Sequence, residues 1–266
     1  MTTTTSPLAT ASRPGRRGLG TLIRTEATLF RRDAGAVFFA LFFPVVLLLG
    51  MGLIIPGMTE PVTDMGTGLD GMPLIHLWAP VVVAVAVATV GLSTLPAYVA
   101  GYREHGVFRR MSTTPMRPAG VLLAHVVVSG VVTVLAIVLA VGAGALLLDI
   151  PMPQQPLLAV AGFVLATLAL FAVGLLIAGV SPKASTASAI GMGVYFPMLF
   201  FAGLWLPIAL MPDVLETIAT FTPLGAASQV LTTAWFGGAT PWLELAVMAG
   251  YAVVVYPLTA KVFRWS

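Results

Sequence analysis

The sequence has no cysteine and few charged residues. The absence of cysteine among its 266 residues excludes disulfide bridges, cysteine-ligated zinc and cysteine-ligated iron–sulfur clusters. Charged residues make up 9% of the chain and hydrophobic residues 58%. A water-soluble domain of this length cannot cover its surface with so few polar side chains, so a soluble protein is excluded. The mean hydropathy of +1.00 instead indicates an integral membrane protein.

Motifs of catalysis and nucleotide binding are also missing. The chain's two lysines, Lys183 and Lys261, follow Pro182 and Ala260, so neither completes the Gly-x-x-x-x-Gly-Lys-[Ser/Thr] loop that binds ATP. There is no HExxH zinc motif, no Gly-x-Ser-Gly of an intramembrane serine protease and no potassium-channel filter. Any nucleotide energy is therefore expected to come from another polypeptide.

Six uncharged segments are long enough to cross a bilayer. A hydrocarbon core about 30 Å thick needs roughly 20 helical residues, and a helix satisfies its own backbone hydrogen bonds in lipid. The predicted spans are 35–55, 74–100, 120–148, 157–180, 188–210 and 242–262. They predict an all-α integral membrane protein with six transmembrane helices. Their interiors hold no Asp, Glu, Lys or Arg, which argues against a proton-coupled carrier or a voltage sensor.

The basic residues predict how these spans are oriented. With the amino terminus in the cytoplasm, all 13 Lys and Arg residues fall in cytoplasmic segments, and the inverted topology would place all of them outside. We therefore expect a multi-pass protein of the cell inner (plasma) membrane with both termini cytoplasmic. The pI near 9.6 follows from this asymmetry and is not a sign of nucleic-acid binding.

The amino-terminal region divides into two parts. Residues 1–18 have too few large apolar groups to pack and are expected to form a disordered cytoplasmic tail. Residues 19–33 predict an amphipathic helix at the inner membrane interface, with arginines on its polar face. Glu26 projects from the apolar face of this helix. It either reaches solvent from a partly exposed helix or contacts an arginine of the next cytoplasmic loop or a partner protein.

The next cytoplasmic loop, residues 102–117, holds five charged residues and a histidine. It is either a solvated anchor that fixes the topology or a surface that contacts something polar. Thr114 and Pro115 are typical of a helix start, with an N-cap followed by proline. Because a loop acid is not expected to stabilise a span, we expect Glu104→Ala to leave folding intact.

Two further features lie in and between the later spans. Residues Asp213 to Phe221, which follow the fifth span, are too few to cross the bilayer and predict an outer-leaflet helix or a re-entrant pair. His125 lies in the third span. Without neighbouring acids it is expected to be a neutral hydrogen-bonding group between helices, rather than a proton relay or a ligand site.

The loop also resembles a known family. Its Arg103-Glu104-x-Gly106, followed by Arg110 and Thr114-Pro115, resembles the segment after the second span of ABC-2 type permeases. The similarity is greatest to drug exporter subunits of the daunorubicin-resistance type. It extends over nearly the whole chain through Phe200 to Gly203, Pro207, Pro212 and Thr222-Pro223-Leu224. Tyr102 departs from it, since the family often has a second acid there.

The resemblance implies a permease subunit of an ATP-binding cassette exporter. The apolar spans without fixed charge favour a lipophilic or amphiphilic compound, such as a drug, natural product or lipid, although members of the family also move polysaccharides and ions. The family arrangement implies a six-span domain over residues 34–266, a separate ATPase subunit that holds ATP and Mg²⁺, and a permease homodimer in a two-plus-two complex. This chain itself would be no enzyme and would hold no cofactor and no metal. The implied coupling residues are Arg103, Glu104, Gly106 and Arg110, with Glu26 facing the same assembly.

Other classes of function remain open on the residues alone. They are a non-transporting membrane assembly or immunity factor, an ion-coupled secondary carrier and an intramembrane enzyme. An adjacent coding sequence for an ATPase would separate the exporter from these alternatives.

Overall fold

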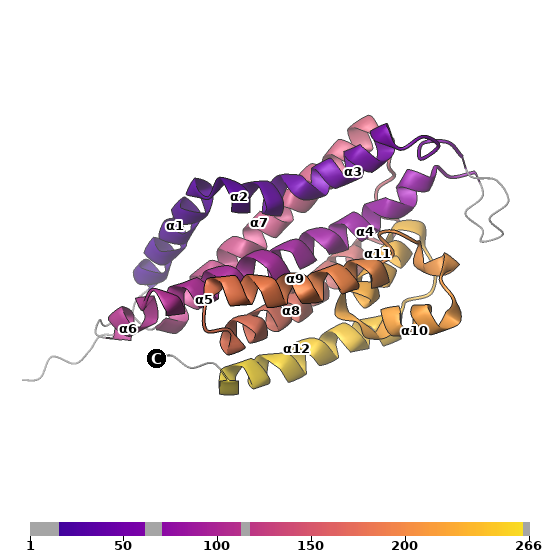
Figure 1. Cartoon of the computed structure of the whole chain (residues 1–266). Helices are drawn as coiled ribbons and strands as arrows, with labels where there is room; N and C mark the ends of the chain where they lie inside the picture. Colours follow the sequence, from indigo (N-terminus) through magenta and orange to yellow (C-terminus); the bar gives the residue numbers. More distant parts are fainter. Residues whose placement is uncertain (1–15, 62–70, 113–117, 263–266) are drawn as a thin grey trace, which may run out of the picture.

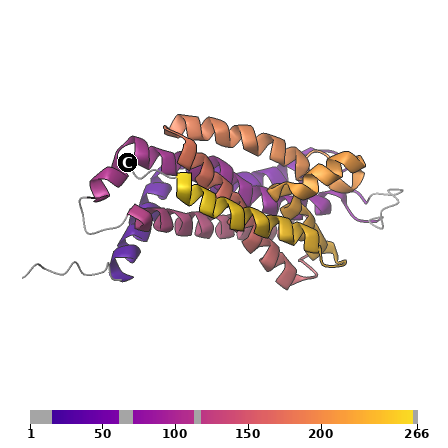
Figure 2. The same cartoon turned by 90° about the horizontal axis from the view of Figure 1, so that it is seen from below.

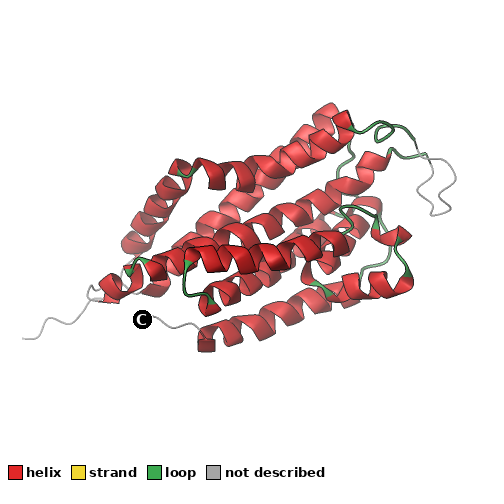
Figure 3. Cartoon of the chain, in the orientation of Figure 1, coloured by secondary structure: helices red, strands yellow, loops and turns green. Residues whose placement is uncertain are grey.

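The computed structural model describes residues 16–61, 71–112 and 118–262. Within these ranges the regular structure is helical, without strands (Figure 3), and Pro61 and Pro73 form an isolated antiparallel bridge. Most of the expected amino-terminal tail, residues 1–15, and the expected helix start at Thr114 and Pro115 lie outside the described residues.

Six helical segments in the described part of the chain are long and apolar enough to cross a membrane. They are Ala34–Ile54, Leu74–Glu104, Gly120–Leu147, Pro156–Val180, Ala184–Phe201 and Trp242–Val262. Figure 1 shows these segments running alongside one another as a bundle. Large apolar side chains on the outside of the bundle are exposed, among them Val138, Leu157 and Val253. The chain is therefore a multi-span membrane protein, as the sequence predicts.

Two of the spans contain a short π-helical segment. The first span consists of α2 (Ala34–Val37), the π-helix η1 (Phe38–Phe42) and α3 (Phe43–Ile54). The second consists of α4 (Leu74–Ala88), the π-helix η2 (Thr89–Thr94) and α5 (Leu95–Glu104). The other spans are formed by α7 (Pro118–Leu147), α8 (Pro156–Val180), α9 (Ala184–Phe201) and α12 (Trp242–Val262).

Shorter helices lie at the two ends of the bundle. They are α1 (Arg16–Arg32), α6 (Val107–Ser112), the 3-10 helix η3 (Ile208–Leu210), α10 (Asp213–Phe221) and α11 (Pro223–Phe236). Figures 1 and 2 place the start of α1, α6 and the end of α12 at one end, and α10 at the other. We call these the α6 end and the α10 end. Both ends of the described chain thus lie at the α6 end.

The second span is the centre of the bundle, with 83% of its most apolar window buried. Its π-helical turn packs against α8 and α9 at two glycines. A Cβ atom on Gly174 of α8 would lie 1.9 Å from the carbonyl oxygen of Gly91, and one on Gly191 of α9 would lie 2.1 Å from that of Leu92. Only glycine permits this approach of the backbones.

The boundaries of two spans differ from the prediction. The fifth helix ends at Phe201 and does not reach residue 210, because Gly203 adopts a left-handed φ of 87° and turns the chain. The second helix continues beyond residue 100 to Glu104. Tyr102, Arg103 and Glu104 therefore occupy the last turn of α5, whereas the sequence analysis assigned them to a loop.

Candidate functional site

Three successive residues at the end of α5 bind three different helices. The Tyr102 hydroxyl donates to the carboxylate of Glu26 on α1. Arg103 donates to backbone carbonyls at the end of α8, and Glu104 accepts from a backbone N–H at the start of α9. Successive helical side chains point about 100° apart, so three neighbours reach three directions. We call Tyr102, Arg103 and Glu104 the α5 hub.

Arg103 binds the carboxyl end of α8. Its guanidinium donates to the carbonyl oxygens of Ala178 at 2.9 Å and Gly179 at 3.1 Å, and also to that of Ser181. The last carbonyls of a helix have no partner within it, and a positive charge there is favourable. The Arg103 side chain thus fixes the position of α8 relative to α5.

Glu104 has the opposite role at the start of α9. Its Oε2 accepts from the Ala184 backbone N–H at 2.9 Å. The chain between α8 and α9 is short, which returns the start of α9 to the side of α5. A carboxylate at a helix amino end stabilises that helix. The structure therefore places Glu104 in α5 with a bond to α9, where the sequence analysis placed it in a loop apart from the spans.

Gly106 and Arg110 belong to the turn and helix that follow the hub. Gly106 has a left-handed φ of 65°, which permits the sharp turn from α5 into α6. Arg110 donates to the His105 carbonyl oxygen at 3.0 Å. The buried ring of Phe108 packs with Val99 and other apolar residues. The short α6 is thereby fixed to the end of the second span.

Glu26 and His125 form a buried pair between α1 and α7. Glu26 is 6% exposed and His125 is 3% exposed. The His125 Nδ1 lies 3.1 Å from the Glu26 Oε2, the same oxygen that accepts from the Tyr102 hydroxyl. The Nε2 of His125 is buried and has no hydrogen-bond partner among the described residues. A neutral ring with its proton on Nδ1 fits this arrangement, because Nε2 then leaves no donor unpaired.

The structure corrects two expectations about this pair. His125 does have a neighbouring acid, and Glu26 contacts a tyrosine and a histidine, where solvent, an arginine of the next loop or a partner protein was expected. The signal in the sequence was one ionisable group on the apolar face of residues 19–33 and another near the cytoplasmic end of a span. Each such group needs a polar partner in an apolar setting, so they could have been paired.

Asp33 joins the bend between α1 and α2 to α5. Its Oδ1 accepts from the Ala36 N–H at 3.0 Å as the N-cap of α2, and its Oδ2 accepts from the Tyr98 hydroxyl at 2.6 Å. These hydrogen bonds, chiefly that from Tyr98, lower the pKa of the Asp33 carboxyl from its ordinary value. Tyr98 and Tyr102 are one helical turn apart, so one face of α5 holds both Asp33 and Glu26.

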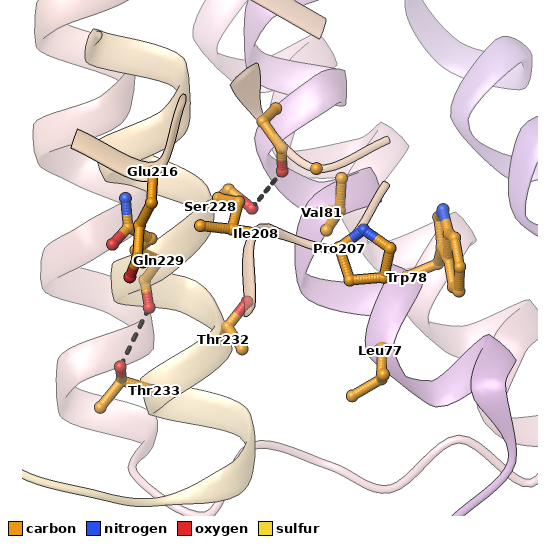
Figure 4. A pocket seen from close by; sticks show the side chains of 12 residues that line it. Leu77, Trp78, Val81, Pro207, Ile208, Glu216, Ser228, Gln229, Thr232 and Thr233 are labelled. Carbon is orange, nitrogen blue, oxygen red and sulfur yellow. Dashed lines mark hydrogen bonds between the residues drawn. The ribbon is translucent and has the colours of Figure 1, made fainter. Parts of the chain in front are cut away.

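A cavity of about 240 Å³ lies at the α10 end, between α4, α10, α11 and residues 202–208. We call it the α10-end cavity. In Figure 4 Glu216 and Gln229 lie on one side and Leu77 and Trp78 on the other. Its wall on α11 also includes three hydroxyl side chains, Ser228, Thr232 and Thr233. The cavity therefore has one polar wall and one apolar wall.

Two buried hydrogen bonds hold residues 202–208, the segment that lines one side of this cavity. The Trp78 Nε1 donates to the Leu204 carbonyl oxygen at 2.8 Å. The Ser228 hydroxyl donates to the Ala202 carbonyl oxygen at 2.7 Å, as the dashed line in Figure 4 shows. In the part of the chain that the structure describes, no group of three or more acidic or histidine side chains is placed to hold a metal ion.

The structure thus shows six candidate membrane spans with a cluster of polar contacts at one end of the bundle. Residues 17–236 match the family described as ABC-2 type transporter. The chain belongs to this family. Its members are transporter membrane subunits, not enzymes, and they normally work with a separate ATP-binding subunit.

A distant relative agrees with this assignment. The chain is 26% identical over 166 residues to a Bacillus subtilis (strain 168) protein named "Putative transport permease YvfS". The match covers 61% of this chain and 66% of the relative's length.

Proposed function

We propose that the chain is the permease subunit of an ATP-driven exporter, and that the α5 hub transmits the movement of a separate ATPase subunit to the membrane helices. The observation that carries this proposal is that Tyr102, Arg103 and Glu104 bind α1, α8 and α9. Membership of the ABC-2 type transporter family supports it.

The proposed path of coupling begins at α6. In this proposal the α6 end faces the cytoplasm, and α6 with Gly106 and Arg110 meets the ATPase. A displacement of α6 moves the end of α5, and the hub then moves the helices that it binds. Packed helices respond to such a push as rigid bodies. Arg103, Glu104 and Glu26 then act inside the permease, as positioning residues, while α6 provides the contact surface.

The remaining parts of the proposal concern the assembly and its place in the cell. ATP and Mg²⁺ bind the partner subunit, and two copies of this permease join two ATPases in the plasma membrane. Both termini are cytoplasmic. Helix α1 lies along the inner membrane surface with Arg24, Arg31 and Arg32 exposed, and α10 and α11 form a re-entrant pair in the outer leaflet.

The α10-end cavity supports a lipophilic or amphiphilic substrate. Its apolar wall suits the body of such a compound, and its polar wall offers hydrogen bonds to a polar group. In the proposed orientation this cavity lies on the exit side. We infer from the resemblance of the loop that the exporter is of the daunorubicin-resistance drug type.

A cross-linking experiment tests the contact with the ATPase. Because the chain has no cysteine, Arg110→Cys introduces a single reactive position on α6. A cysteine-to-lysine cross-linker should join it to the ATPase partner. The matched control is Thr240→Cys, exposed at the opposite end of the bundle, which should give no cross-link. A cross-link from position 240 and none from position 110 would contradict the proposed contact surface.

A transport measurement separates the exporter from a secondary carrier. Ethidium serves as an amphiphilic probe, and its efflux from cells that express both subunits should stop when the Walker A lysine of the ATPase is replaced. Efflux by this chain alone, driven by a proton gradient, would instead support an ion-coupled carrier.

A further inference from the structure

An apolar groove lies between α1 and α7, apart from both the α5 hub and the α10-end cavity. It encloses about 310 Å³. From α1 it is lined by Ile23, Ala27, Phe30 and Arg31, and the rest of its lining is apolar. Among the described residues that line it, Arg31 is thus the one that is charged.

The wall on α7 continues onto the outside of the bundle. Val127, Val131 and Leu135 line the groove at every fourth position and are 37%, 55% and 50% exposed. Eight helical residues rise about 12 Å, close to the roughly 15 Å of hydrocarbon in one leaflet. Val127 and Val131 lie in the first half of the span Gly120–Leu147, on the side of the α6 end, and Leu135 lies just past its middle. The strip therefore has the depth and polarity of a site for one acyl chain.

Unpaired positive charge lies beside this strip. Arg24, Arg31 and Arg32 of α1 are exposed, and within the described residues their guanidinium groups make no hydrogen bond or ion pair. Asp33 is the acid nearest to Arg31 in the sequence, and its two oxygens accept from Ala36 and Tyr98. Three exposed arginines of α1 outnumber this carboxylate, and Arg31 lines the groove itself, so the rim favours an anionic group.

We propose that this groove binds one anionic phospholipid of the inner leaflet, with an acyl chain along the α7 strip and its phosphate at Arg31. The leaflet rests on the cytoplasmic orientation proposed above, while the site itself goes beyond the proposed function. Ile23, Ala27 and Phe30 contact the lipid on the same helix that carries Glu26 to the hub. The bound lipid thereby holds α1 against α7.

Native mass spectrometry of the purified full chain tests the site. The probes are phosphatidylglycerol and phosphatidylcholine with identical palmitoyl and oleoyl chains. One phosphatidylglycerol should remain bound, and phosphatidylcholine should be retained at least about tenfold less. Arg31→Gln should lower phosphatidylglycerol retention roughly tenfold, the effect of losing a charge-assisted hydrogen bond. Val131→Trp should also lower it, because the larger side chain fills the strip while the charge is unchanged.

Two variants are the matched controls. Arg32 is the next residue of α1 but does not line the groove, and Lys183 is an exposed base between α8 and α9. Arg32→Gln and Lys183→Gln should each change retention by less than about twofold, since only a residue at the groove edge contacts the phosphate. If Arg31→Gln fails to fold, the comparison of the two lipids and the Val131→Trp variant still test the proposed lipid site.

Three results would overturn the proposal. Equal retention of the two lipids would show that the charge of the headgroup plays no part in binding. An Arg32→Gln effect as large as that of Arg31→Gln would show that the arginines attract lipid diffusely, without a defined site. A disulfide between two Val131→Cys chains in the membrane would show that a second copy covers the groove. The lipid measurement needs neither ATP nor the ATPase, so its failure and the failure of the exporter proposal are distinguishable.

Discussion

Glu104 shows how one side chain can serve both folding and coupling. Its carboxylate binds the first turn of α9, so Glu104→Ala should lower the free energy of unfolding of the permease by about 1 kcal/mol, as loss of an N-cap does. The same variant should reduce stimulation of the ATPase, because α5 no longer holds α9. Glu104→Gln should keep more of the stability and more of the ATPase stimulation than Glu104→Ala, since its amide oxygen can still accept from the Ala184 N–H.

Thermal unfolding and ATP hydrolysis measure the two effects of Glu104→Ala. The control is Glu60→Ala, an exposed acid near the α10 end, which should change neither. If Glu104→Ala leaves both unfolding and ATPase stimulation unchanged, the bond between Glu104 and α9 contributes neither to stability nor to coupling.

The buried Glu26 should matter more to stability than any exposed residue of α1. Glu26→Ala leaves the Tyr102 hydroxyl and the His125 N–H without their acceptor, at a cost of about 1 to 3 kcal/mol for each group. Arg24→Ala on the same helix should cost under about 0.5 kcal/mol. Thermal unfolding of the two variants gives the comparison, and equal costs would show that the buried pair contributes nothing to the stability of the fold.

The sequence identified the residues of the site better than their partners. Arg103 and Glu104 were selected as part of a charged loop, but their bonds go to α8 and α9, more than 70 positions away in the chain. Helical periodicity reports which residues share a face and not which distant helix end meets that face. The return of the chain between α8 and α9 decides this, and no local pattern encodes it.

At the scale of helices, the contact of α8 and α9 with η2 depends on two glycines. Gly174→Ala and Gly191→Ala should each lower stability by about 1 to 3 kcal/mol, because the added methyl meets a backbone carbonyl that cannot move aside. Gly193→Ala is the control, since no atom lies within 4 Å of its Cβ position, and it should be neutral or stabilising. Thermal unfolding measures all three, and a silent Gly174→Ala would show that the backbones do not approach so closely.

Span prediction succeeded where length and polarity decide, and failed where single residues turn the chain. The third span, predicted at 120–148, is a helix in the structure over Gly120–Leu147. The fifth was drawn too far because residues 202–210 are as apolar as the helix before them, and hydropathy does not register the left-handed Gly203. The π-helical turns have no signature in hydropathy, because they change the hydrogen-bond register and not the composition.

At the scale of the whole molecule, orientation follows from charge, and the final prediction tests it. All 13 basic residues fall on one side of the predicted spans, and both ends of the described chain lie at the α6 end. Single cysteines can be placed freely because the chain has none. His105→Cys should react with a membrane-impermeant thiol reagent only after the cytoplasmic face is opened. Met152→Cys, exposed at the other end, should react in intact cells.

The labelling results also bear on the proposals, because the hub and the lipid groove both lie at the α6 end. If position 105 reacted in intact cells and position 152 did not, α6 would face away from the cytoplasmic ATP, and no ATPase could act on the hub. The positive-inside rule makes this inverted result unfavourable, since it requires 13 basic residues outside the cytoplasm. Reaction of both positions in intact cells would instead contradict the six-span arrangement itself, because an odd number of spans separates them.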